Sequence, residues 1–258
     1  MVKSQFIDTH AHLYADEFKD DIELIITKAQ ENGITQVVLP NIDEESIAGL
    51  KNLVTRWPDF FVPMMGLHPC SVTENYQAQL ATILTELDSQ ENYKAVGEIG
   101  IDLYWDKSTL PYQQEAFITQ CQWAVERQLP VAIHARESTS VLIDLLQKME
   151  QLPQGVFHCF GGTLEEAQQI IEMDMYLGIG GVLTFKNSNL KEILPLMPIE
   201  KLVLETDSPY LAPVPFRGKR NESSYVLHIA TFLSGVLNRS IEEIGEITSA
   251  NARKLFKI

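Results

Sequence analysis

The sequence predicts a (β/α)8 TIM barrel, an α/β fold in which eight parallel strands alternate with helices. Three observations predict it. The chain has 258 residues, a length typical of one such barrel. Eight short apolar runs ending in turn-forming residues recur along it, and the stretches between them have helical periodicity. The ends of these runs lie about 20 to 36 residues apart, which brackets the roughly 30 residues of a βα unit. We therefore expect one domain over 1–258.

Each expected element follows from its local pattern. Helical spacing of apolar residues is clear in 117–125, for example, where Pro130 then stops the helix. Two segments after the last strand, 224–236 and 240–256, are expected to be extra helices that pack on the barrel. The strands themselves are expected at the apolar runs 5–8, 36–39, 62–65, 95–98, 131–134, 156–158, 176–179 and 202–205.

An open, doubly wound sheet is the competing architecture. Such sheets usually have fewer strands and often a glycine-rich phosphate loop after the first strand. In this chain His10 and His12 occupy that place instead. The count of strands and the missing loop both favour the closed barrel.

Composition limits the possible functions. At 45% apolar residues the chain can bury one substantial core. The net charge of −15 argues against a protein that coats nucleic acid by neutralising many phosphates, although bound cations would reverse the field locally. No apolar run is long enough to span a membrane and no leader pattern is visible, so we expect an unprocessed cytoplasmic protein without membrane contact or an obligate protein partner.

The three cysteines are expected to have no special chemistry. They are odd in number, far apart and without a C-x-x-C pair, which argues against disulfides and a structural zinc site. A reducing compartment fits this usage best. Cys70, Cys121 and Cys159 are each expected to be small buried hydrophobic residues.

Ionisable residues gather at or just after the ends of six expected strands. In a closed parallel barrel these ends meet on one face, where barrel enzymes place their active sites. His-x-His is meaningful there, because side chains at i and i+2 of a strand share a face and can hold one ion. An ordinary pair of buried polar residues is the alternative. The six segments are Asp8–His12, Gly66–Pro69, Gly97–Gly100, Ile133–Arg136, His158–Phe160 and Glu205–Pro209.

Several of these residues suit a metal centre. Glu98 lies between two glycines and could bridge two cations, or else form a salt bridge at the barrel mouth. His134 and His158 end adjacent strands and are placed to hold a second ion. Asp207 would complete the first site and accept a proton from the attacking water. Glu205 stays outside the expected ligand set, and His228 is expected to be an ordinary helix residue.

A set of motifs, taken in order, resembles the TatD family of metal-dependent deoxyribonucleases. They are DTHAH, GLHP, GEIGID followed by YW, PVAIHAR, HCFGG, LETDSPYL and RGKRNE, and the resemblance extends from residue 6 to the C-terminal NARKLF. It implies an amidohydrolase-type barrel that hydrolyses phosphodiesters of DNA, with His68 at the site but outside the direct ligand set. The ligands of two metal ions that it implies are His10, His12, Glu98, His134, His158 and Asp207.

This chain departs from the family pattern at two places. Ser223 and Ser224 follow Asn221 and Glu222, where the family commonly has proline, which questions the shape of that loop. Ala11 stands where the family often has cysteine and should not alter metal binding.

The expected mechanism uses two divalent cations, whose identity among Zn, Mn, Mg, Fe, Co and Ni stays open. We expect Asp207 to be the base, and His68 to contact a phosphate oxygen or protonate the leaving group unless it only orders its loop. Arg217, the first of a basic cluster with Lys219 and Arg220, would contact phosphate or be a solvated residue. Tyr104 and Trp105 would stack on an unpaired base, or else pack in the core.

DNA ends or single strands are the expected substrate. The few basic residues near the site favour exonucleolytic trimming, and the 3′ to 5′ direction rests on the family resemblance alone. One alternative is an amidohydrolase or lactonase acting on a small molecule, but Glu98 occupies the place where such enzymes often have a carboxylated lysine. The other is a catalytically silent scaffold, which the complete set of candidate ligands disfavours.

Overall fold

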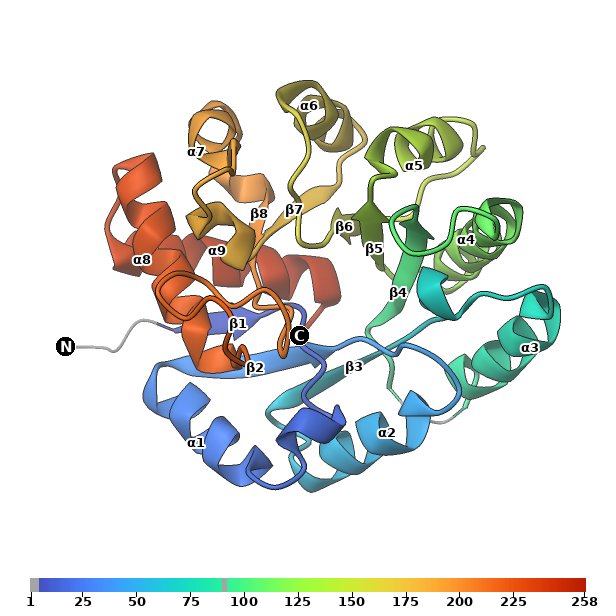
Figure 1. Cartoon of the computed structure of the whole chain (residues 1–258), viewed down its shortest axis with the longest axis horizontal. Helices are drawn as coiled ribbons and strands as arrows, with labels where there is room; N and C mark the ends of the chain where they lie inside the picture. Colours follow the sequence, from blue (N-terminus) through green and yellow to red (C-terminus); the bar gives the residue numbers. More distant parts are fainter. Residues whose placement is uncertain (1–4, 90–91) are drawn as a thin grey trace.

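The computed structural model describes residues 5–89 and 92–258 and contains an eight-stranded parallel barrel surrounded by helices (Figure 1). Neighbouring strands pair in chain order. Closure between the last and first strands relies on the Thr9 amide, which donates to the Leu204 carbonyl at 3.0 Å, and on a bridge from Ala11 to Ser208. The predicted barrel is therefore confirmed. Its strands are β1 (Phe6–Asp8), β2 (Ile34–Leu39), β3 (Phe61–Met65), β4 (Ala95–Asp102), β5 (Val131–Arg136), β6 (Gly155–Phe157), β7 (Tyr176–Ile179) and β8 (Leu202–Leu204).

The helices cover the outside of the barrel with their apolar faces turned inward. Two of them begin with reciprocal caps, in which Thr163 pairs with Glu166 and Ser240 with Glu243. None of the helices in the described ranges is both long and apolar enough to cross a bilayer. They are α1 (Ile22–Glu31), α2 (Ser46–Arg56), α3 (Tyr76–Leu87), α4 (Leu110–Arg127), α5 (Thr139–Leu146), α6 (Leu164–Glu172), α7 (Leu190–Ile193), α8 (Val226–Leu237) and α9 (Ile241–Phe256).

Apolar side chains fill the barrel interior at the end opposite the carboxyl ends of the strands. Each strand contributes inward apolar residues such as Ile7, Val38 and Met64 to an inner core. Ala252, Leu255 and Phe256 of α9 join this core and close it from below. The second of the two expected C-terminal helices is thus part of the barrel's packing, and only the carboxyl ends of the strands remain open for a site.

Strand β4 differs from its predicted course. Val96 pairs with Val131 and Ile99 with Ile133, so β4 uses one residue more than β5 over this stretch. Glu98 lies in the resulting bulge, and the strand continues to Asp102, whereas the sequence suggested an end at Glu98. The bulge redirects a side chain without ending the pairing.

Burial of the cysteines was predicted correctly for Cys121 but not for Cys70. Cys70 is exposed because it lies in the short 3-10 helix η2 (Pro69–Ser71), which carries the chain outward after β3. Cys159 is partly buried beside the barrel mouth.

Candidate metal centre

Glu98 lies at the middle of a cluster of imidazoles at the barrel mouth. Its Oε2 is 3.1 Å from His10 Nε2 and 3.3 Å from His12 Nε2. Its Oε1 is 2.9 Å from His134 Nδ1 and 2.7 Å from His158 Nε2. The two oxygens of one carboxylate therefore face two separate pairs of imidazoles, an arrangement suited to a bridge between two ions.

Asp207 completes the cluster from the loop after β8. Its Oδ1 is 3.7 Å from His12 Nε2 and 4.0 Å from His10 Nε2. The structure thus brings together all six residues expected as ligands. In the described part of the chain, possible ligand atoms lie within 4.8 Å of one another in three overlapping groups, namely His10, His158 and Asp207; His10, His12 and Glu98; and His68, Glu98 and His134. A mixed imidazole and carboxylate set fits divalent transition metals.

Tyr14 determines which nitrogen of His12 carries the proton. The Tyr14 hydroxyl donates its only proton to the Pro40 carbonyl at 2.6 Å. Its oxygen, 2.9 Å from His12 Nδ1, can then only accept, so Nδ1 carries the hydrogen. The lone pair of Nε2 is left facing Glu98 and Asp207, as a metal ligand requires.

Asp102 performs the same task for His134. Asp102 Oδ2 lies 2.9 Å from His134 Nε2 and accepts a hydrogen bond from it, so the ring proton is on Nε2. The lone pair of Nδ1 is then left facing Glu98. His158 is backed by the fully buried Glu205, whose Oε1 lies 3.6 Å from Nδ1. Glu205 is absent from the three ligand groups found in the described residues.

His68 has the opposite tautomer to His12. Its Nδ1 accepts a hydrogen bond from the Cys70 amide at 3.1 Å, so the proton is on Nε2. That nitrogen points toward the centre and lies 3.4 Å from Glu98 Oε1. His68 is therefore oriented as a hydrogen-bond donor rather than a ligand.

Buried charge shapes the titration of the cluster. Burial alone would raise the pKa of Glu98, but the imidazoles of His158, His68 and His10 outweigh it and hold the pKa well below its usual range. Burial would lower the pKa of His134, yet Asp102 and Glu98 raise it. Protons and cations compete for the imidazole nitrogens, so metal binding should weaken as the pH falls.

The rim differs in part from expectation. Trp105 is 70% exposed and Tyr104 is 51% exposed, so neither belongs to the core. The Arg217 guanidinium lies 3.8 Å from the Phe185 ring centre. Arg220, expected to be part of the same basic cluster, instead forms paired hydrogen bonds with Asp21.

Sequence reasoning missed one rim residue, Arg136. It follows His134 by two residues on β5 and therefore shares its strand face. Its exposed guanidinium lies 3.8 Å from the Tyr104 ring centre and 5.6 Å from that of Trp105. The spacing from His134 was the signal that could have identified it.

The loop beyond β8 is held in place despite its unusual serines. Asn221 donates to the Thr206 and Tyr210 carbonyls at 2.7 and 2.6 Å. The Ser224 hydroxyl donates to Glu222 at 2.5 Å, and both serines are buried in a 3-10 turn leading into α8. His228, on α8, contacts the rings of neighbouring aromatic residues and lies apart from the three ligand groups.

Replacing Asp102 with asparagine should weaken metal binding by about 10- to 100-fold, the usual effect of losing a partner of a metal-bound histidine. Asparagine keeps an oxygen that can accept hydrogen bonds from the backbone amides of Tyr104 and Trp105, as Asp102 Oδ1 does. It can also turn its amide toward His134 and favour the wrong tautomer. Calorimetric titration of the purified protein with Mn²⁺ or Zn²⁺ measures the change. Asp59→Asn, at an exposed position just before β3, is the control, and equal affinity of the two variants would contradict the tautomer assignment.

Comparison with known proteins identifies relatives of this site. A family model described as TatD related DNase matches residues 7–257. The uncharacterized metal-dependent hydrolase YabD of Bacillus subtilis is 38% identical, with 97% of this chain and 98% of that protein covered. A protein of Pantoea ananatis named 3′-5′ ssDNA/RNA exonuclease TatD is 32% identical, with 96% and 98% covered. The crystal structure of YjjV, a TatD homologue of Escherichia coli, superimposes with a TM-score of 0.93 at 27% identity, with both chains fully covered.

Proposed function

The chain belongs to the TatD family of metal-dependent hydrolases, and from that premise we propose that it trims single-stranded DNA from an end, in the 3′ to 5′ direction. The observation that carries the proposal is Glu98, whose two oxygens face two pairs of imidazoles. A pair of cations is the usual device for in-line displacement at a phosphodiester. The proposed ligands are His10, His12, Glu98, His134, His158 and Asp207.

The residues present would hold two divalent ions among Zn, Mn, Mg, Fe, Co and Ni. Bound there, the ions would act as Lewis acids on the phosphodiester and lower the pKa of an attacking water. Everything else is supplied by the side chains of the chain, which orient the ligand nitrogens and move protons.

Asp207 would accept the proton of the attacking water. Burial raises its pKa to about 6, which makes it a stronger base than an exposed aspartate while still ionised at neutral pH. His68 would donate its Nε2 hydrogen to a phosphate oxygen or to the leaving oxygen. Because His68 Nδ1 accepts a hydrogen bond from the Cys70 amide, the ring proton stays on Nε2.

The rim supports a strand end as the substrate. Arg136 and Arg217 are the proposed phosphate contacts, and Trp105 is the proposed stacking surface for an unpaired base. Tyr104 would contribute mainly by holding Arg136, since one face of its ring is already covered. With a net charge of −15, only a short stretch of backbone would be neutralised.

Purified protein loaded with Mn²⁺ should shorten a 5′-labelled single strand stepwise and leave a covalently closed circle of the same sequence uncut. Product ladders on a denaturing gel measure both. Equal cleavage of the circle would mean internal attack. If neither DNA were cut while an aryl ester was hydrolysed rapidly, a small-molecule amidohydrolase or lactonase activity would replace the proposal.

A further inference from the structure

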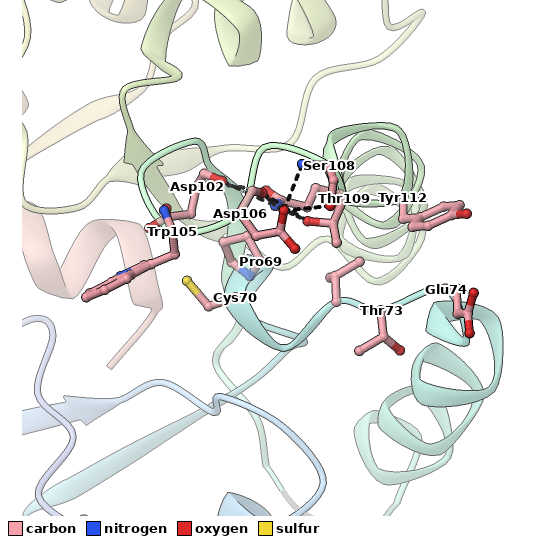
Figure 2. Close-up of a pocket in the computed structure, with 12 residues that line it drawn as sticks. Pro69, Cys70, Thr73, Glu74, Asp102, Trp105, Asp106, Ser108, Thr109 and Tyr112 are labelled. Carbon is pink, nitrogen blue, oxygen red and sulfur yellow. Dashed lines mark hydrogen bonds between the residues drawn. The ribbon is translucent and has the colours of Figure 1, made fainter.

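A cavity of about 490 Å³ lies beside the metal centre, within the range of small-ligand pockets (Figure 2). One wall is formed by Asp102 at the end of β4, by Asp106 in the segment that follows and by the start of α4, and the other is the segment from Pro69 to Glu74. Asp102 belongs to both places, because it lines the cavity and also contacts His134. Only the side chain of Asp102 would therefore separate a ligand in the cavity from the expected metal ligand His134.

The cavity is acidic, and the rim arginines Arg136 and Arg217 are not among its lining residues. Asp102, Asp106 and Glu74 line it, and no lysine or arginine is among its lining residues as the structure describes them. Phosphate would be repelled from this interior, whereas groups that donate hydrogen bonds would be attracted. Trp105 stands at one end and Tyr112 at the other, which provides aromatic surface for a flat ligand (Figure 2).

Asp106 offers an available acceptor in this cavity. Its Oδ1 accepts from the Ser108 amide at 2.8 Å and from the Ser108 hydroxyl at 2.6 Å. Within the described residues, Oδ2 makes no hydrogen bond. Asp102, by contrast, is fully engaged, since its oxygens serve His134 and two backbone amides.

The walls of the cavity are fixed by α4. Gln113 binds the backbone of Asp102, accepting from its amide at 2.8 Å and donating to its carbonyl at 3.2 Å. Two helical turns later, Gln120 makes the same pair of bonds with Leu67, at 2.7 and 3.2 Å. Both glutamines are buried, so the strand ends that carry Asp102 and His68 are attached to one helix.

We propose that this cavity is a subsite for the terminal nucleoside of the strand and that it favours bases with an exocyclic amino group. The inference rests on the proposed nuclease function and deepens it. The phosphate would lie at the metal centre and Arg136, while the base entered the acidic cavity. An amino group of cytosine, adenine or guanine can donate to Asp106 Oδ2, whereas a carbonyl at the same position meets a carboxylate and is repelled.

Two single strands that differ only in the terminal nucleoside, deoxycytidine or deoxyuridine, test the preference. The bases differ at C4, where cytosine has an amino group and uracil a carbonyl, and at the adjacent N3, which is an acceptor in cytosine and an N–H donor in uracil. We expect kcat/KM for release of the first nucleotide to be higher for deoxycytidine by on the order of tenfold. Asp106→Asn should bring the ratio close to one, because asparagine keeps the oxygen for Ser108 and replaces Oδ2 with a donor. Glu74→Gln tests the second carboxylate in the same way, and Asp59→Asn, remote from the cavity, should keep the wild-type ratio.

Each outcome separates this inference from the function on which it rests. If both strands are trimmed at equal rates by the wild type, the nuclease function stands and the subsite is wrong. If the wild type prefers deoxycytidine but neither Asp106→Asn nor Glu74→Gln changes the ratio, the preference arises elsewhere and the assignment fails. Absence of cleavage of any DNA would overturn the function and the subsite together.

Discussion

Asp207→Asn should lower kcat by about 10²- to 10⁴-fold, the range typical of losing a general base. Asparagine has nearly the same shape but cannot take up the proton of the attacking water. The ion nearest His134 and His158 should stay bound, because both imidazoles also face Glu98 Oε1, which the substitution leaves in place. Steady-state kinetics together with the metal content of the purified variant measure both effects.

Asp59→Asn serves as the matched control, since it makes the same chemical change at an exposed position away from the barrel mouth. Its kcat should equal that of the wild type. Near-normal turnover of Asp207→Asn with two metals bound would remove Asp207 from the role of base. Loss of all bound metal would show instead that Asp207 acts mainly as a ligand.

Chelation should abolish hydrolysis while leaving the barrel folded. The inner core closed by α9 and the outer layer beneath the helices are both apolar and do not involve the metal ligands. Without ions, Glu98 still has four imidazole nitrogens within 3.3 Å, so its charge is not left unpaired. Circular dichroism before and after chelation should show the same helical signal, and activity should return when Mn²⁺ is added. Global unfolding after metal removal would show that the ions are structural.

The fold could be predicted from sequence because each strand and helix leaves a local pattern. Eight apolar runs between periodic segments determine a barrel, and the meeting of strand ends then brings distant histidines together. The extent of β4 was beyond this reasoning. The bulge at Glu98 allows pairing with β5 to resume at Ile99, so β4 continues four residues further than its apolar run suggested.

The residues that orient the ligands could not be predicted in the same way. Tyr14 needs the Pro40 carbonyl, 26 residues away, before its hydroxyl becomes an acceptor for His12. Asp102 was hidden because the strand was expected to end before it. Arg220 looked equivalent to Arg217 in sequence, and only the position of Asp21 across the loop shows that it is already paired. These roles depend on tertiary hydrogen bonds, which leave no periodic signal.

The paired hydrogen bonds that the side chains of Gln113 and Gln120 make with the backbone have a consequence for turnover. Two facing walls attached to one helix cannot approach or separate independently, so the cavity should have nearly the same shape before and after a strand enters it. The enzyme would then discriminate among strand ends when they first bind, by steric and polar fit to a preformed cavity. No closing motion after binding would be needed. A mismatched end should therefore dissociate without waiting for a wall of the cavity to open.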